Sequence, residues 1–267
     1  MVITSSLANG LASRTFQQVM TEMVAVFILV KQITNRQGLP STPKGARKLL
    51  SKLKPLYEQV SLIVREDETK AYGPYLSWLW FEPAGTDGSI SLSKIVDAPL
   101  SRYREIEPVV RFTKHAVSRG HQRLDAILWS DVQRDFLSSS LFAWLFYRAK
   151  ERLPIMQAFL PTPNGVFAGE FDADGRLNML TYIGIENASS RWQMAYGVAT
   201  ELEEIFPEYA NQVLDAVVLM RKPKLDNIIE WITQRLSAPE FHWLQDVYEA
   251  RPDPVGEAWL SLSGNKS

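Results

Sequence analysis

The sequence predicts an α+β fold, a helix-rich single domain around a small antiparallel sheet. Three observations support this. Apolar residues recur at helical spacing near both ends of the chain, short apolar runs separated by turn sequences occupy its middle, and the runs are grouped rather than alternating with helices. Grouped strands flanked by helices favour α+β over a parallel α/β design. With 267 residues, 46% of them hydrophobic, the chain can bury a sizeable core.

The first part of the chain predicts two long helical segments. Residues 6–36 place apolar side chains at helical spacing. Thr42 and Pro43 then have the N-cap and first-turn pattern that opens a helix rich in Lys and Leu. Pro55 either kinks this helix or separates it from a second one that continues through Val64.

The middle of the chain mixes strands and helices. Two apolar runs on either side of a turn that contains Pro and Gly predict a hairpin near 75–93. A helix is expected from Pro108 to Gly120, because proline is favoured in a first helical turn and glycine just after a last one. Another helix is expected over 130–152.

The clearest strand signal lies near 155–185. Three short apolar runs are separated by turns, and the second turn contains Gly175, which can adopt a positive φ. This pattern predicts a three-stranded antiparallel meander. Its strands are expected at Ile155–Leu160, Val166–Phe171 and Leu177–Ile185.

Helical sequence returns after the meander, and the tail beyond Ser261 is expected to fray. We expect a single domain over 1–267. The alternative is a division into a basic helical half, 1–124, and an acidic half with the β-meander, 125–260. The expected helices of this last part span 190–206, 208–221, 226–236 and 238–250.

Cysteine is absent, which excludes disulfides, thiol catalysis, Fe–S clusters and thiolate zinc sites. This composition fits a reducing compartment, and we expect a cytoplasmic protein without a secretory signal. The longest apolar run, Met23–Val30, is shorter than the roughly 20 residues that cross a bilayer. No membrane insertion is therefore expected.

The net charge of −1 conceals a difference between the two halves. Residues 1–123 contain 17 Lys and Arg against 10 Asp and Glu, a balance of +7, whereas residues 124–267 contain 12 against 20, a balance of −8. No acidic residue lies between Glu22 and Glu58, while seven basic residues do. The difference predicts either a charged partner or a fold in which one half faces the other.

Two basic clusters are the candidate sites for an anionic partner. The first lies on the expected helix that begins at Pro108, opposite its apolar face. Cations with nearby aromatic side chains could contact phosphates and stack on bases. The alternative interpretation is the ordinary solvated face of an amphipathic helix. The clusters are Arg111, Lys114, His115 and Arg119, and Lys44, Arg47 and Lys48.

Acidic residues gather near the end of the expected helix 190–206. Glu201, Glu203 and Glu204 precede Pro207, and negative charge at a helix C-terminus opposes the macrodipole by about 0.3–1 kcal/mol per residue. A basic partner, within this chain or in another protein, would explain them. The alternative is a solvated helix end.

The sequence indicates neither a metal site nor a cofactor. His115 and His121 are six residues apart, which does not place two imidazoles on one helical face, and His242 is distant. We expect the histidines to be partly exposed polar residues. The chain contains no Gly-rich phosphate loop, dinucleotide fingerprint or Gly-x-Ser-x-Gly elbow, so no cofactor is expected.

One spacing suggests an enzyme. Arg235 and His242 have six residues between them, which resembles the Arg-x4–6-His motif of the HEPN ribonucleases. The resemblance covers this motif alone. It implies a metal-independent ribonuclease in which Arg235 and His242 act on an RNA phosphodiester.

The leading functional hypothesis is non-enzymatic. We expect a cytoplasmic interaction or regulatory protein that engages a macromolecule, in the first place another protein, through segregated basic and acidic surfaces. Such charge separation orients and speeds association more than it sets affinity. The alternatives are the HEPN-like ribonuclease and a protein that binds nucleic acid without sequence preference.

Overall fold

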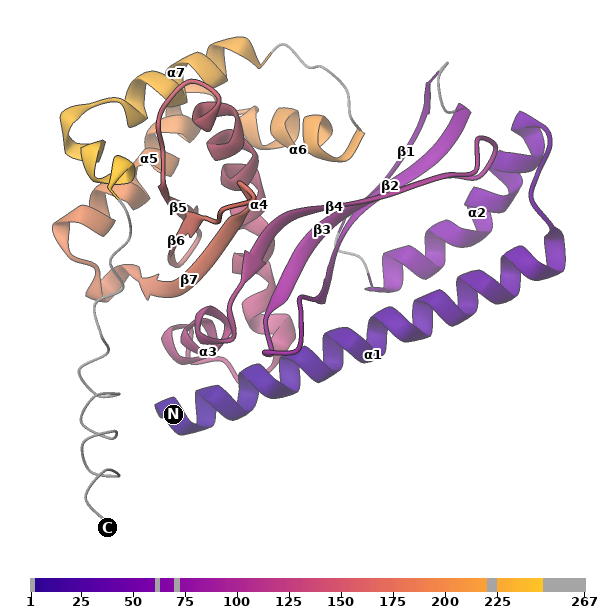
Figure 1. The fold of residues 1–267 in the computed structure, drawn as a ribbon, viewed down its shortest axis with the longest axis horizontal. Coiled ribbons are helices and arrows are strands. Elements are labelled where there is room, and N and C mark those ends of the chain that lie inside the picture. Colours follow the sequence, from indigo (N-terminus) through magenta and orange to yellow (C-terminus); the bar gives the residue numbers. More distant parts are fainter. Residues whose placement is uncertain (1–2, 61–62, 70–72, 220–224, 247–267) are drawn as a thin grey trace.

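The computed structural model has an α+β architecture built on one seven-stranded mixed sheet (Figure 1), which confirms the predicted fold class. It describes residues 3–60, 63–69, 73–219 and 225–246. The strand order is β1-β2-β3-β4-β7-β6-β5. The strands are β1 (Ile63–Thr69), β2 (Gly73–Pro83), β3 (Ile90–Ala98), β4 (Tyr103–Phe112), β5 (Gln157–Thr162), β6 (Gly165–Phe171) and β7 (Leu177–Gly184).

The sheet consists of two antiparallel parts joined by one parallel pair. Strands β1 to β4 pair in sequence order, and so do β5 to β7. β4 and β7 are parallel and pair only at Arg111 and Phe112 of β4. The hairpin near 75–93 and the meander near 155–185 are confirmed as β2–β3 and β5–β7. The sheet is larger than expected because β1 and β4 also join it.

The expected helix from Pro108 to Gly120 is wrong in its first part. Residues 103–112 form β4, and helix α3 begins only at Lys114, where the Thr113 hydroxyl accepts a hydrogen bond from the Ala116 amide at 3.1 Å. Pro108 is opposite Ser93, next to a bulge in β4 where Val109 has no partner in β3. Proline is tolerated beside such an irregularity, so it does not mark a helix start here.

The second helix also differs from the expectation. It begins at Pro43, as predicted, and continues unbroken past Pro55 to Val60. Val64, which the sequence placed in a helix, lies in β1 opposite Trp78. The pairing of β1 with β2 is a contact that no local pattern in 61–69 indicates.

The remaining helices agree with the predicted segments, except that the last is a 3-10 helix rather than the α-helix expected over 238–250. Residues 220–221 and 247–250, and the tail beyond Ser261, lie outside the described residues. The helices are α1 (Ser5–Gln37), α2 (Pro43–Val60), α3 (Lys114–Arg123), α4 (Trp129–Lys150), η1 (Ile185–Asn187), α5 (Ser190–Ile205), α6 (Tyr209–Leu219), α7 (Asp226–Leu236) and η2 (Pro239–Gln245).

Strand β2 separates two parts of the core. Trp78 and Trp80 point to one face, where they pack with α1 and α2. Phe81 points to the other and makes edge contacts with Trp129 and Phe136 of α4. Alternate residues of a strand face opposite sides of its sheet, and both sides of β2 are covered. This explains why β2 is buried continuously from Pro74 to Phe81 rather than at alternate residues.

Candidate functional site

The cluster on α2 is divided by its ion pairing. Lys44 and Lys48 are four residues apart, so they lie on one stripe of the helix surface, and Lys52 extends it. Arg47, one helical turn from Lys44, differs from the lysines because it forms an ion pair with Glu68 of β1. The three lysines are exposed, and the described part of the chain holds no ion-pair partner for them. We call Lys44, Lys48 and Lys52 the basic stripe.

Local sequence determines where the basic stripe points. The Gly45 amide donates a hydrogen bond to the Thr42 hydroxyl at 3.2 Å, which fixes the start of α2. Leu49, Leu50 and Leu53 are buried against α1 and the sheet. Because these leucines occupy one side of an amphipathic helix, the lysines are left on the solvent side.

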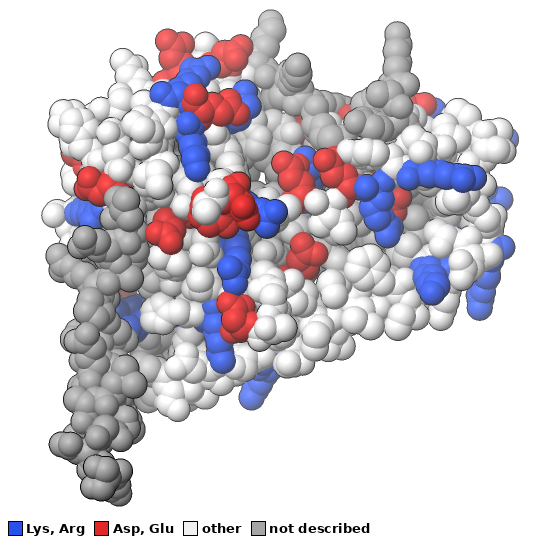
Figure 2. Space-filling model, viewed as in Figure 1, with Lys and Arg blue, Asp and Glu red and all other residues white. Residues whose placement is uncertain are grey.

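A groove lies beside the basic stripe, between α1, α2 and the turn that joins β3 to β4. Its volume is about 470 Å³. Two exposed cations of its lining, Lys31 and Arg102, have no ion-pair partner among the described residues. Figure 2 shows Lys and Arg side chains gathered over this end of the molecule, at the right of the view. We call this cavity the α1–α2 groove.

The structure divides the other predicted basic cluster. Arg111 lies on β4 and pairs with Asp87 at 2.8 Å. Lys114, His115 and Arg119 lie on α3. The Arg119 guanidinium donates to Gln122 Oε1 at 2.8 Å. The single helical face expected for the four residues is therefore wrong, because a strand ends and a helix begins between the first and the second of them.

The acidic cluster is also divided. Glu201, on α5, pairs with Arg235 of α7 at 2.7 Å. Glu203 and Glu204 lie near the C-terminal end of α5 and are exposed. The cation that pairs with Glu201 thus comes from the same, acidic half of the chain and not from the basic half. Among the described residues, Glu204 has no ion-pair partner.

Arg235 is engaged by two carboxylates. Besides Glu201, it binds Glu240 at 2.6 Å, and its guanidinium lies over the Phe241 ring at 4.8 Å. The hydrogen bond to Glu201 raises the pKa of the guanidinium, although burial opposes this. His242 is exposed on η2. An arginine that is already neutralised is poorly placed to stabilise an anionic phosphodiester.

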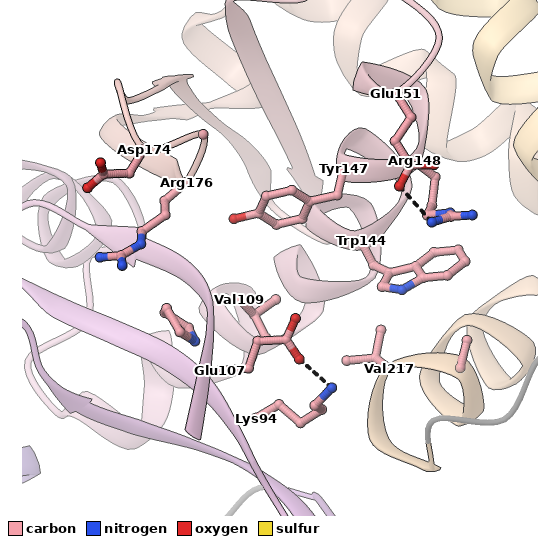
Figure 3. Close-up of a pocket in the computed structure, with 13 residues that line it drawn as sticks. Lys94, Glu107, Val109, Trp144, Tyr147, Arg148, Glu151, Asp174, Arg176 and Val217 are labelled. Atoms are coloured by element: carbon pink, nitrogen blue, oxygen red, sulfur yellow. Dashed lines mark hydrogen bonds and ion pairs between the residues drawn. The ribbon is translucent and has the colours of Figure 1, made fainter. Parts of the chain in front are cut away.

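A second cavity, of about 460 Å³, lies where β4 and β7 diverge (Figure 3). Trp144 and Tyr147 of α4 contribute aromatic rings to its wall. Lys94 pairs with Glu107, and Arg148 pairs with Glu151 at 2.6 Å. With Arg176 and Asp174, the lining holds three cations and three carboxylates. These charges compensate, whereas the lining of the α1–α2 groove holds Lys31, Arg102 and Arg104 against Asp97 alone.

The histidines differ in their surroundings. His115 and His242 are exposed, as expected, but His121 is only 1% exposed. Its Nδ1 donates to the Ala126 carbonyl at 2.8 Å and its Nε2 accepts from the Thr15 hydroxyl at 2.9 Å. Thr15 belongs to α1, so this imidazole joins α3 to α1. Within the described ranges, no three His, Asp or Glu side chains gather as metal ligands.

The burial of His121 predicts a pH-dependent stability. Burial lowers the pKa of its imidazole, although the Ala126 carbonyl and Asp131 oppose this. Below about pH 6.5 the unfolded chain therefore binds a proton that the folded chain resists, and the free energy of unfolding falls as the pH falls. Urea unfolding of wild type and of His121→Gln should show a steeper loss between about pH 7.5 and 5.5 for wild type. Equal losses would contradict this assignment.

Sequence reasoning missed the apolar part of this end of the molecule. Helix α1 carries exposed Val24, Phe27, Ile28 and Leu29, and Leu39 follows it at 54% exposure. The available signal was the run Met23–Val30, which is apolar on every side of the helix rather than on one. By length and composition α1 could also cross a membrane. Core helices of soluble proteins and signal sequences meet the same two criteria.

Comparison with protein-family models finds no match, and comparisons with curated proteins and with solved structures find none either. The chemistry of this chain's own side chains is thus what indicates a function. The largest uncompensated charge described above is at the basic stripe and the α1–α2 groove.

Proposed function

We propose that this is a non-enzymatic binding protein that engages a negatively charged macromolecular surface through the basic stripe. The observation that carries the proposal is the run from Lys31 to Lys54, which holds seven cations and no carboxylate. Lys44, Lys48 and Lys52 project from α2 without an ion-pair partner among the residues that the structure describes. An anionic partner would supply the missing counter-charge.

The basic stripe costs the folded protein stability. Like charges four residues apart on a helix repel by roughly 0.2–0.5 kcal/mol per pair. Lys44 also lies in the first turn of α2, where no acidic residue offsets it, and cations there oppose the helix macrodipole. By contrast, Arg47 and Lys54 have carboxylate partners in Glu68 and Glu66. A destabilising arrangement on one side only is typical of a binding surface.

The acidic end of α5 would contribute to orientation. Glu203 and Glu204 are exposed there, and a polyanion would repel them while attracting the basic stripe. A protein with such separated charges approaches its partner in a preferred orientation, and the effect weakens as salt screens it.

The test is binding to heparin, a generic polyanion, across a series of salt concentrations. We expect the triple variant Lys44→Glu, Lys48→Glu and Lys52→Glu, the stripe variant, to lose most of its affinity. The slope of log Kd against log salt should flatten by about three, because roughly one counterion is released per lysine contact.

The matched control reverses three exposed arginines elsewhere, in Arg134→Glu, Arg152→Glu and Arg176→Glu. This charge control has the same net charge as the stripe variant, so it separates the effect of the basic stripe on binding from the effect of overall charge. We expect it to bind heparin as wild type does, with a small loss from long-range repulsion. Equal losses in both variants would overturn the proposal.

A further inference from the structure

The surface next to the basic stripe is apolar. On α1, Val24 and Ile28 are four residues apart and about half exposed, on the side away from the buried Val26 and Val30. Lys31 follows Ile28 by three residues and therefore continues the same side of the helix. Exposed aliphatic side chains thus adjoin a free cation on one face of α1.

The α1–α2 groove continues this apolar surface inward. Val30, Leu49 and Leu53 line it and are buried, whereas Phe27 and Leu39 line it and remain partly exposed. Its volume of about 470 Å³ falls in the range of small-molecule sites, roughly 300–1,000 Å³. The groove therefore offers a hydrophobic cavity that opens directly onto the exposed face.

In the part of the chain that the structure describes, two unpaired cations line the groove, and a third lies close to its α2 side. Lys31 lies on the α1 side, and Lys52 lies one helical turn from Leu49 on the α2 side. Arg102 closes the third side with a φ of 55°. A side chain other than glycine costs about 1–2 kcal/mol in this left-handed region. An arginine at this position is unfavourable for the turn, which points to a role for its guanidinium.

Resting on the proposed function, we infer that the anionic surface is a lipid bilayer, with the α1–α2 groove receiving an acyl chain of an anionic lipid. Lys31, Arg102 and the basic stripe contact the head groups, and Ile28 and Leu39 enter the boundary between head groups and acyl chains. Peripheral proteins combine apolar and basic side chains on one face in this way.

A bilayer suits these residues better than the two other classes of polyanion. Cations and aromatic rings strengthen binding to nucleic acid, whereas exposed Val24, Ile28 and Leu39 would add little affinity for it. Protein interfaces concentrate their binding energy in Trp, Tyr and Arg, with Leu and Val under-represented. Helix α1 also keeps one side packed, since Val26 and Val30 are buried with α2 and β2, so it lies on the membrane rather than across it.

The test is flotation of the full chain with vesicles of phosphatidylserine and phosphatidylcholine, beside vesicles of phosphatidylcholine alone and a single-stranded RNA. Of the two kinds of vesicle, wild type should bind only the anionic one, and it should bind that one more tightly than the RNA. The stripe variant should bind them about 100-fold more weakly, since each cation near the surface contributes about fivefold. The apolar variant Ile28→Gln and Leu39→Gln should bind them about tenfold more weakly yet retain wild-type binding to heparin.

Matched controls are the charge control and the exposed apolar pair Ile127→Gln and Ile205→Gln, both of which should bind vesicles as wild type does. Vesicle binding by the apolar variant at wild-type strength would overturn the lipid inference and leave the proposed function standing. Binding of heparin and RNA without binding of anionic vesicles would do the same. Failure of wild type to bind any of these probes would overturn both proposals. Vesicle binding by the stripe variant at wild-type strength would overturn the proposed function.

Discussion

Replacing Asp135 by alanine should lower the free energy of unfolding by about 3–5 kcal/mol, because it removes a buried carboxylate on which three donors depend. Asp135 is 1% exposed on α4. Its oxygens accept hydrogen bonds from the Tyr182 hydroxyl at 2.6 Å, the Thr162 hydroxyl at 2.7 Å and the Asn164 amide at 2.9 Å. The alanine would leave the buried Thr162 and Tyr182 hydroxyls without this acceptor, whereas the exposed Asn164 amide could bond to water instead.

These bonds also explain how the meander is attached to α4. Burial raises the pKa of the Tyr182 phenol, and its hydrogen bond to Asp135 raises it further, so the phenol stays a donor at any moderate pH. Thr162 ends β5 and Tyr182 lies on β7. One carboxylate therefore holds two strands of the meander and the loop after β5.

Urea unfolding followed by tryptophan fluorescence measures the effect. The matched control is Asp131→Ala, the same change at an exposed position in the first turn of α4, where a carboxylate contributes about 0.3–1 kcal/mol. Asp135→Asn keeps an acceptor oxygen and should recover part of the loss. If Asp135→Ala and Asp131→Ala lower the free energy of unfolding equally, the hydrogen bonds of Asp135 do not make the expected contribution to stability.

The second large effect is expected at Phe136, where alanine should cost about 3–5 kcal/mol through lost burial and the cavity that remains. The ring of Phe136 is fully buried. Its centroid lies 4.7 Å from that of Phe112 on β4, 4.6 Å from Phe167 on β6 and 5.2 Å from Trp129. Because β4 and β7 share so short a pairing, this aromatic cluster is a principal contact between the two parts of the sheet.

The measurement is the urea midpoint of Phe136→Ala, with Phe136→Leu as the conservative variant that fills most of the volume and should cost about 1 kcal/mol. Amide hydrogen exchange adds a readout of where stability is lost. We expect faster exchange in both β3 and β6, since Phe136 contacts both parts of the sheet. Faster exchange in one part alone would show that the two parts do not depend on a shared core.

Much of the fold follows from local patterns. The spacing of apolar residues over 6–36 predicts α1, and Thr42 with Pro43 predicts the start of α2, because capping and amphipathicity act within a few residues. The turn at Gly175 predicts the meander for the same reason. The prediction at Pro108 is wrong because the compatibility of this proline with a strand depends on the adjacent bulge, where Val109 of β4 has no partner in β3.

The candidate site could be predicted only in part. The acid-free run from Lys31 to Lys54 is visible in the sequence. Lys44 and Lys48, which the sequence suggests as binding residues, are exposed, and their role in binding stays a prediction. Arg47 and Arg111 belong to the same sequence pattern, yet each is paired with a carboxylate 21 and 24 residues away along the chain, respectively. Spacing along a helix relates only neighbours within about one turn, so it cannot reveal these partners.

The sequence by itself determined the α+β class, most helices, the hairpin, the meander and the concentration of positive charge between Glu22 and Glu58. The tertiary structure alone decided that β1 and β4 complete a seven-stranded sheet, which cations are left without a partner, and that an apolar groove opens beside them. The physical reason is the range of the interactions. Helix periodicity and capping are set by residues within a turn of each other, whereas strand pairing, ion pairing and cavities depend on residues that only the folded chain brings together.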